Sequence, residues 1–183
     1  NRDGIAYVRF PEWYFCPKCR RFQPLSKWIA EYNKKVKEKD RANNRNMSRK
    51  LYCPKDRIEL VVARIVTVCG RGHINDFPWV KWTHAKNRGG PKQVCANPQL
   101  TFTTSPVSSE GLDGLSLKCT ACNASATLKD AFNDGEFERL DEKTENKYDF
   151  TCEGRHPWKN QKDACPCYPK VLQMGSSSVY FPV

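Results

Sequence analysis

The chain has 183 residues, of which 39% are hydrophobic and 28% charged, a composition that is typical of a globular protein and excludes a disordered or fibrous one. No apolar run approaches the roughly 18 residues that cross a bilayer, and no secretory signal pattern opens the sequence, so we expect a cytoplasmic protein that does not span a membrane. The 31 Lys and Arg outnumber the 20 Asp and Glu, and the net charge of +11 favours polyanionic partners, nucleic acid first.

The predicted elements begin with a strand over 9–22 that leads into a cysteine knuckle. Pro24 then opens a helix, because apolar side chains recur at helical spacing on one face. This stripe comprises Leu25, Trp28, Ile29, Tyr32 and Val36. The Asn-rich stretch 43–46 predicts a loop, and the β-branched run that follows predicts a strand over 60–68.

Further along the chain, two glycines after Cys69 permit the tight turn of another knuckle. Strands are predicted over 100–104 and 115–118, and a short helix over 128–132. The closing run 176–183 is unusually apolar and suggests a piece of a longer protein.

Short elements, 12 prolines and a mean hydropathy of −0.73 predict a small, loop-rich α+β fold with short antiparallel strands. Such a fold buries less apolar surface than its length allows, so another source of stability is needed. The ten cysteines and three histidines are the candidates. We therefore predict zinc-ribbon-like knuckles distributed over two parts, residues 1–68 and 69–183.

Four large aromatic residues accompany the predicted knuckles: Phe77, Trp79, Trp82 and Trp158. One interpretation is a packed core between metal sites, the usual role of large aromatic side chains, and this is the arrangement we expect. The other is a platform on which unpaired bases stack. Solvent exposure distinguishes the two.

Basic residues concentrate over 34–50, whereas Asp and Glu dominate 130–149. The apolar helical stripe ends at Val36, so the basic segment beyond it has little to pack against. We predict that this segment contacts DNA phosphates without reading the base sequence. The alternative is a solvated surface loop. The predicted contact residues are Lys34, Lys35, Lys37, Arg41, Arg45, Arg49 and Lys50.

The first Cys-x-x-Cys pair is formed by Cys16 and Cys19. This spacing lets two thiolates face one ion and supplies half of a tetrahedral zinc site. Cys53 is the nearest downstream partner and begins a Cys-Pro-Lys-Asp sequence, a knuckle whose last cysteine is replaced by Asp56. The fourth ligand of this first site is either Asp56, which would be a harder ligand, or Cys69.

The second pair is formed by Cys119 and Cys122. Three cysteines lie downstream of it, so we predict a four-cysteine site that is completed by Cys152 and Cys165. Cys167 remains an alternative to Cys165, because the two residues are close in sequence on one side of a predicted strand.

The residues that remain, Cys69, His73, His84 and Cys95, form a third candidate set of two cysteines and two histidines. Two zinc ions are therefore expected, and a third if this set also closes. A secreted disulfide scaffold fits less well, because no secretory signal is visible. A thioredoxin-like redox pair is also disfavoured, since neither pair follows the strand of a βαβ unit.

Catalysis is not expected within this chain. A catalytic zinc keeps an open position beside a base, and His73, Asp76 and His84 are the residues best suited to such an arrangement. The sequence contains no His-Glu-x-x-His, no His-x-Glu with Pro-Cys-x-x-Cys and no Walker motif. We therefore predict zinc that only stabilises the fold.

Several short motifs stand in a fixed order along the chain. They are Arg9-Phe-Pro11, Cys16-Pro-Lys-Cys19, Cys69-Gly-Arg-Gly-His-Ile-Asn-Asp-Phe-Pro-Trp79 with Trp82 and His84, Cys119-x-x-Cys122, Cys152-Glu-Gly-Arg-His-Pro-Trp158, and Val171-Leu-Gln-Met-Gly-Ser-Ser-Ser-Val-Tyr-Phe-Pro182. In this order they resemble the N-terminal cysteine-rich part of the DrmB family, the helicase-partner proteins of the bacterial DISARM anti-phage system. The Gly-His-Ile-Asn-Asp-Phe-Pro-Trp stretch is the most specific of them.

The resemblance implies a much longer protein, a superfamily 2 helicase as partner (DrmA-like), DNA as ligand and a role in restricting phage DNA, with no established active site in this part. Two positions depart from the family pattern. Asp56 stands where a second Cys-x-x-Cys would end, and Met174 stands where Arg is expected. We therefore predict a non-catalytic, zinc-binding module for DNA binding and assembly, with ATP hydrolysis in the partner. The alternative is a metal-dependent hydrolase or nuclease that acts on DNA.

Overall fold

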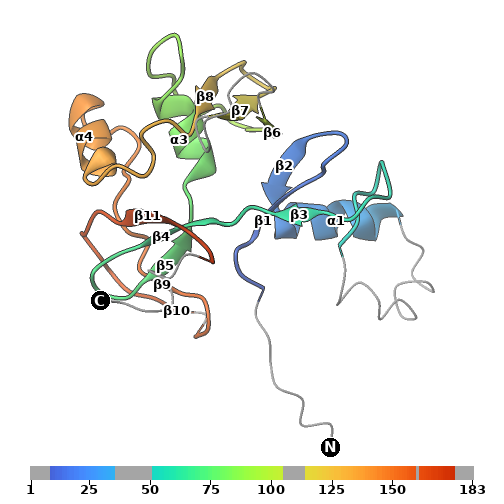
Figure 1. The fold of residues 1–183 in the computed structure, drawn as a ribbon, viewed down its shortest axis with the longest axis horizontal. Coiled ribbons are helices and arrows are strands. Elements are labelled where there is room, and N and C mark those ends of the chain that lie inside the picture. Colours follow the sequence, from blue (N-terminus) through green and yellow to red (C-terminus); the bar gives the residue numbers. More distant parts are fainter. Residues whose placement is uncertain (1–8, 36–50, 105–113, 160, 176–183) are drawn as a thin grey trace, which may run out of the picture. The chain divides into compact units, whose positions relative to one another are not determined.

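The computed structural model describes residues 9–35, 51–104, 114–159 and 161–175 (Figure 1). The chain divides into two compact units, and each unit is assembled from separate stretches of sequence. Unit 1 consists of Asn1–Pro11, Arg64–Phe77 and Ala131–Val183, and unit 2 consists of Glu12–Ala63 and Pro78–Asp130. This division does not coincide with the predicted parts 1–68 and 69–183, because segments from both sides of residue 68 fold together within each unit.

Unit 2 is built around a six-stranded antiparallel sheet. In order across the sheet, its strands are β3 (Val61–Val62), β1 (Trp13–Phe15), β2 (Arg21–Pro24), β6 (Leu100–Thr104), β7 (Leu115–Cys119) and β8 (Ser125–Thr127). The predicted helix is present as α1 (Leu25–Lys35), and a second short helix, α3, spans Trp79–Ala85. The predicted strands 100–104 and 115–118 are confirmed as β6 and β7.

The two faces of this sheet differ in polarity. The register places Arg21, Thr101 and Lys118 side by side across β2, β6 and β7, so their side chains share one face. Phe22 and Leu100 alternate with them, lie on the opposite face and are buried. One face of the sheet therefore packs into the core, and the other presents hydroxyl and cationic groups.

Aromatic side chains form much of the core of unit 2. Phe22 contacts Trp79 edge to face, with ring centroids 4.8 Å apart. Trp82 is fully buried, and its indole N–H donates to the carbonyl oxygen of Thr127 at 2.9 Å. On α1, Trp28 is buried with Leu25 packed against its cluster, whereas Ile29 is exposed and Val36 lies outside the described residues, so the predicted apolar stripe forms a core face only in part.

Within its described residues, unit 1 contains a three-stranded sheet, a two-stranded ribbon and one helix. The sheet order is β11 (Lys170–Gln173), β4 (Ile65–Val68) and β5 (Ile74–Asp76). The ribbon pairs β9 (Arg155–His156) with β10 (Gln161–Lys162), and the helix α4 spans Glu136–Lys143. The predicted α+β class with short antiparallel strands is thus confirmed in both units.

The strand predicted over 60–68 is not continuous. It divides into β3 in unit 2 and β4 in unit 1. The reason lies in the backbone: the N–H of Ala63 donates to Trp13 at 2.9 Å, whereas the carbonyl of the next residue, Arg64, accepts from Met174 at 2.6 Å. Neighbouring peptide groups are therefore paired with different sheets.

The short helix predicted over 128–132 is also absent, because these residues form turns, with Asp130 at a φ of 65°. The helix of this region is α4, inside the acidic stretch, where Phe137 stacks on Phe150 with ring centroids 5.1 Å apart. Among the described residues, no helix has the length and apolar character needed to span a membrane.

The packed-core interpretation of the aromatic cluster is confirmed for three of its four members. Phe77, Trp79 and Trp82 are each no more than 1% exposed. Trp158 differs, because 57% of its surface is exposed. A single exposed ring does not form the stacking platform that was the alternative interpretation.

Candidate metal centres

The structure brings all twelve predicted ligand residues into three groups of four. The candidate ligand atoms of each group lie within 4.8 Å of one another. Site A consists of Cys16, Cys19, Cys53 and Asp56, site B of His84, Cys95, Cys119 and Cys122, and site C of Cys69, His73, Cys152 and Cys165. Sites A and B belong to unit 2 and site C to unit 1. All ten cysteines lie in described stretches and are free thiols.

Site A is formed by two knuckles with matching backbone geometry. In the first, the N–H of Arg20 donates to the carbonyl of Cys16 at 2.9 Å, and Arg20 has a φ of 62°. In the second, the N–H of Arg57 donates to the carbonyl of Cys53 at 2.9 Å, and Arg57 has a φ of 56°. Asp56 therefore occupies in the second knuckle the position that Cys19 has in the first. The fourth residue of site A is Asp56, whereas Cys69 belongs to site C.

The side chains of site A converge closely. The Oδ2 atom of Asp56 lies 3.3 Å from Cys16 Sγ and 3.4 Å from Cys53 Sγ, and Cys19 Sγ lies 3.8 Å from Cys53 Sγ. Burial raises the pKa of the Cys16 thiol to about 12. Burial acts in the same direction on Cys53, but N–H donors from Asp56 and Lys55 outweigh it and lower the pKa of that thiol.

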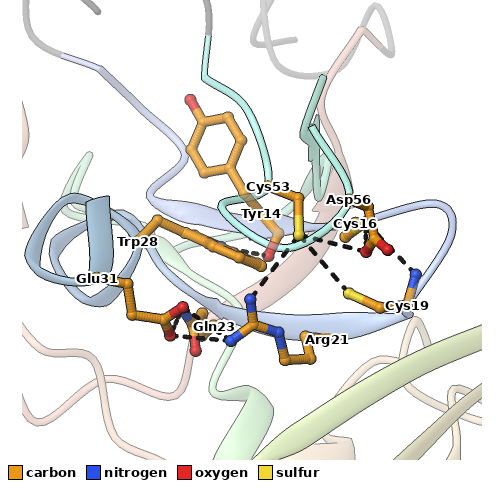
Figure 2. A network of polar contacts seen from close by, with 9 residues as sticks. All are labelled: Tyr14, Cys16, Cys19, Arg21, Gln23, Trp28, Glu31, Cys53 and Asp56. Carbon is orange, nitrogen blue, oxygen red and sulfur yellow. Dashed lines mark hydrogen bonds and ion pairs between the residues drawn. The ribbon is translucent and has the colours of Figure 1, made fainter. Parts of the chain in front are cut away.

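Arg21 connects site A to helix α1, as Figure 2 shows. Its guanidinium lies 3.8 Å from Cys53 Sγ, donates to Glu31 at 2.8 Å and stands over the ring of Trp28 at 4.8 Å. Burial disfavours the charge on Arg21, but the hydrogen bonds to Glu31 outweigh it and raise the pKa of the guanidinium. Sequence reasoning missed this residue, because no spacing rule relates an arginine to a metal knuckle.

Site B combines a knuckle with a helix. The backbone turn at Cys119 repeats the geometry of site A, since the N–H of Asn123 donates to the Cys119 carbonyl at 2.8 Å. Cys95 Sγ lies 3.6 Å from Cys119 Sγ. His84, in the last turn of α3, lies with Nε2 3.3 Å from Cys122 Sγ. Burial raises the pKa of the Cys95 thiol to about 11.

The backbone selects the tautomer of His84. Its Nδ1 lies 2.7 Å from the carbonyl oxygen of Val80, one turn earlier in α3. A carbonyl can only accept, so Nδ1 carries the proton and donates. The lone pair of Nε2 is therefore directed at the thiols, which is the arrangement in which a second hydrogen bond orients a metal-binding imidazole.

Site C gathers around the turn between β4 and β5. The Nδ1 atom of His73 lies 3.3 Å from Cys69 Sγ and 3.7 Å from Cys152 Sγ. Cys69 Sγ lies 3.9 Å from Cys165 Sγ. Asn75 donates to Cys152 Sγ at 3.5 Å. Burial raises the pKa of the Cys152 thiol to about 12.

The other nitrogen of His73 has a carboxylate partner. Its Nε2 lies 3.7 Å from Asp163 Oδ2, which also lies 3.0 Å from His156 Nε2. The hydrogen bond to His156 is the main cause that lowers the pKa of Asp163. A carboxylate behind a metal-binding histidine orients the ring and raises its basicity. Asp163 and His156 were not predicted, because their roles depend on the β9–β10 ribbon.

Comparison with known proteins shows the family to which this chain belongs. Residues 1–181 match a family described as a domain of unknown function, DUF8724. The chain belongs to the DUF8724 family. It is also similar to the DISARM protein DrmB of Bacillus paralicheniformis, with 35% identity over 133 residues. The match covers 71% of this chain and 20% of that protein, so the chain spans about a fifth of its relative's length. The resemblance to the DrmB family is thereby confirmed.

The predicted grouping of ligands in this DUF8724 chain is corrected by the structure. Cys119 and Cys122 do not meet Cys152 and Cys165, which belong to site C. The third predicted set is likewise divided: Cys69 and His73 lie in site C, and His84 and Cys95 lie in site B. Cys-x-x-Cys spacing identifies half of a site but carries no information on which distant segment folds against it. Cys167 packs beside site C without belonging to its ligand group.

The predicted DNA-contact segment of the DUF8724 chain is described only in part. Lys34 and Lys35 form the end of α1, and Lys34 is exposed. The other predicted contacts lie outside the described residues: Lys37, Arg41, Arg45, Arg49 and Lys50.

Site A yields a prediction about its unusual ligand. Asp56→Cys should hold a zinc ion more tightly, because a thiolate is a softer ligand than a carboxylate, and transfer of that zinc to a competing chelator should slow by about tenfold. Asp56→Ala should accelerate the same transfer, as measured with a chromogenic chelator. Wild-type zinc content and transfer rate in Asp56→Ala would show that the carboxylate is not a ligand.

Proposed function

We propose that this DUF8724 chain is a zinc-stabilised, non-catalytic module that binds nucleic acid within a phage-defence protein. Three donor groups support the metal part of the proposal. Sites B and C each offer three thiols and one imidazole, and site A offers three thiols and one carboxylate. Thiolate-rich sets of four protein ligands are typical of structural zinc, and they leave no open position for a reacting water. One zinc ion in each site is therefore the cofactor we assign.

The observation that carries the nucleic-acid part is the distribution of charge between the units. In the printed sequence, unit 2 contains 20 Lys and Arg against 9 Asp and Glu, whereas unit 1 contains 11 of each. The whole net charge of +11 thus belongs to unit 2. A concentrated excess of cationic side chains is the electrostatic signature of a protein that binds polyanions, and nucleic acid is the commonest of these.

A similar protein supports a proposal about the larger system in which this module acts. The similar protein is named as a DISARM protein. By analogy we assign the chain to a DISARM-type defence complex in the cytoplasm, in which a helicase of the DrmA kind hydrolyses ATP and this module supplies binding and assembly. The neutral unit 1 is then the part suited to protein contacts, because it lacks an excess charge that would favour a polyanion.

The proposal is tested by measuring metal content and nucleic-acid affinity on the same preparation. X-ray absorption at the zinc edge should report about three zinc ions with sulfur-rich, four-ligand coordination. Fluorescence anisotropy with labelled DNA should give an affinity that falls linearly with log salt, since bound cations release counterions. Absence of DNA binding at low salt would refute the nucleic-acid role. Cleavage of the DNA by the zinc-loaded chain would instead favour the alternative, a metal-dependent nuclease.

A further inference from the structure

A groove lies in unit 2 where helix α1 and strand β2 meet the stretch that leads into β6, and its lining includes the buried Phe22 and Leu100 beside polar side chains. It has a volume of about 640 Å³. Helix α1 contributes Lys27 and Lys34, β2 contributes Arg21 and Gln23, and the stretch that leads into β6 contributes Gln99. Phosphate and base edges are bound by such ammonium and amide groups.

The two lysines are placed to meet one strand at separate points. Lys27 and Lys34 are seven residues apart on α1, which puts them on nearly the same side of the helix and about 10 Å apart along its axis. Both are exposed, and neither forms an ion pair with any residue that the structure describes. Among the described lining residues, Glu31 is the one carboxylate, and Arg21 neutralises it at 2.8 Å. The groove is therefore cationic overall.

We infer that this groove binds a single strand of nucleic acid, a conclusion that rests on the function proposed above and specifies its surface. A cationic groove with an aromatic side chain is the combination that holds unpaired strands. Trp13 lines the groove and is partly exposed. Its ring centroid lies 4.9 Å from that of Phe22. The volume is in the range that encloses a small organic ligand, so it admits a short stretch of one strand.

The groove is joined to site A through hydrogen bonds. Arg21 reaches Cys53 Sγ at 3.8 Å and Glu31 at 2.8 Å, and Gln23 also donates to Glu31 at 2.8 Å (Figure 2). The residues that line the groove on β2 and on α1 are thus held by one network that ends at a ligand of site A. A metal ion at site A would therefore fix the width of the groove without touching the strand.

The test compares two double variants of the full chain, each with its zinc content verified. Lys27→Gln with Lys34→Gln removes the groove lysines, and Arg88→Gln with Lys129→Gln removes two exposed basic residues of the same unit that do not line the groove. Binding of a labelled oligothymidine is measured as a function of salt. The groove variant should bind about tenfold more weakly, with a salt slope that is lower by about 1.4, since each lost phosphate contact contributes about 0.7 on a single strand. The control variant should bind the oligothymidine more tightly than the groove variant does.

A second measurement identifies the contacts directly. Ultraviolet crosslinking of the wild-type chain to a strand that contains 5-bromouracil should place adducts on Trp13 or on residues 97–101. Equal affinity and equal salt slope in the two double variants, with wild-type binding intact, would show that the groove is not the binding site. The proposed function would then still stand. Tighter binding of the wild-type chain to the matching duplex would overturn the single-strand assignment. Failure of the wild-type chain to bind either form would refute both proposals.

Discussion

Replacing both Cys119 and Cys152 with Ser should remove two equivalents of zinc, because the structure assigns these cysteines to different sites in different units. Each single variant should lose one equivalent. The cost is large, since a structural zinc site contributes about 10–16 kcal/mol of apparent folding free energy in small zinc peptides. Cys119→Ser should therefore unfold the β6–β7–β8 part of unit 2, and Cys152→Ser the β4–β5 part of unit 1.

The double variant separates two models of the metal sites. If Cys119 and Cys152 shared one four-cysteine site, as their spacing alone suggests, the double variant would lose no more zinc than either single variant. Elemental analysis of the purified proteins counts the ions, and hydrogen exchange locates the unfolded segments. Cys167→Ser is the matched control, because this thiol lies beside site C without belonging to it, and it should retain wild-type zinc content.

Trp82→Ala should destabilise unit 2 by about 3–5 kcal/mol, the usual cost of deleting a large aromatic side chain from a packed core. The indole is fully buried, donates to the Thr127 carbonyl at 2.9 Å and lies under the ammonium of Lys86 at 5.5 Å. His84 follows two residues later on the same short helix, so zinc at site B should also exchange faster.

The loss is measured by hydrogen exchange in zinc-saturated protein, where protection of the β8 amides reports the opening of this region. Ile29→Ala is the matched control, because Ile29 is 37% exposed on α1 and should change stability by no more than about 0.5 kcal/mol. The loss of stability in Trp82→Phe should lie between those of Trp82→Ala and Ile29→Ala, because phenylalanine keeps most of the side-chain volume but lacks the indole N–H donor. Unaltered protection in Trp82→Ala would contradict the role of this side chain in the core.

Local signals in the sequence predicted the local structure well. The apolar spacing after Pro24 predicted α1, and the Cys-x-x-Cys pairs and the Cys53–Asp56 sequence predicted knuckles whose backbone hydrogen bonds the structure displays. These features depend on residues within a few positions of one another, so their pattern is visible in the sequence. The burial of Trp79 and Trp82 was predicted from the usual role of large aromatic side chains in a packed core.

The partners of each knuckle were decided by the tertiary structure alone. His84 reaches Cys122 because α3 packs near β8, and Cys152 reaches His73 because it folds against the β4–β5 turn. The break at Ala63–Arg64 likewise depends on which strands accept their backbone bonds, and the confinement of the net charge to unit 2 depends on how distant segments combine. A spacing rule describes one segment, whereas a four-ligand site closes only when remote segments bring their donors within reach of one ion.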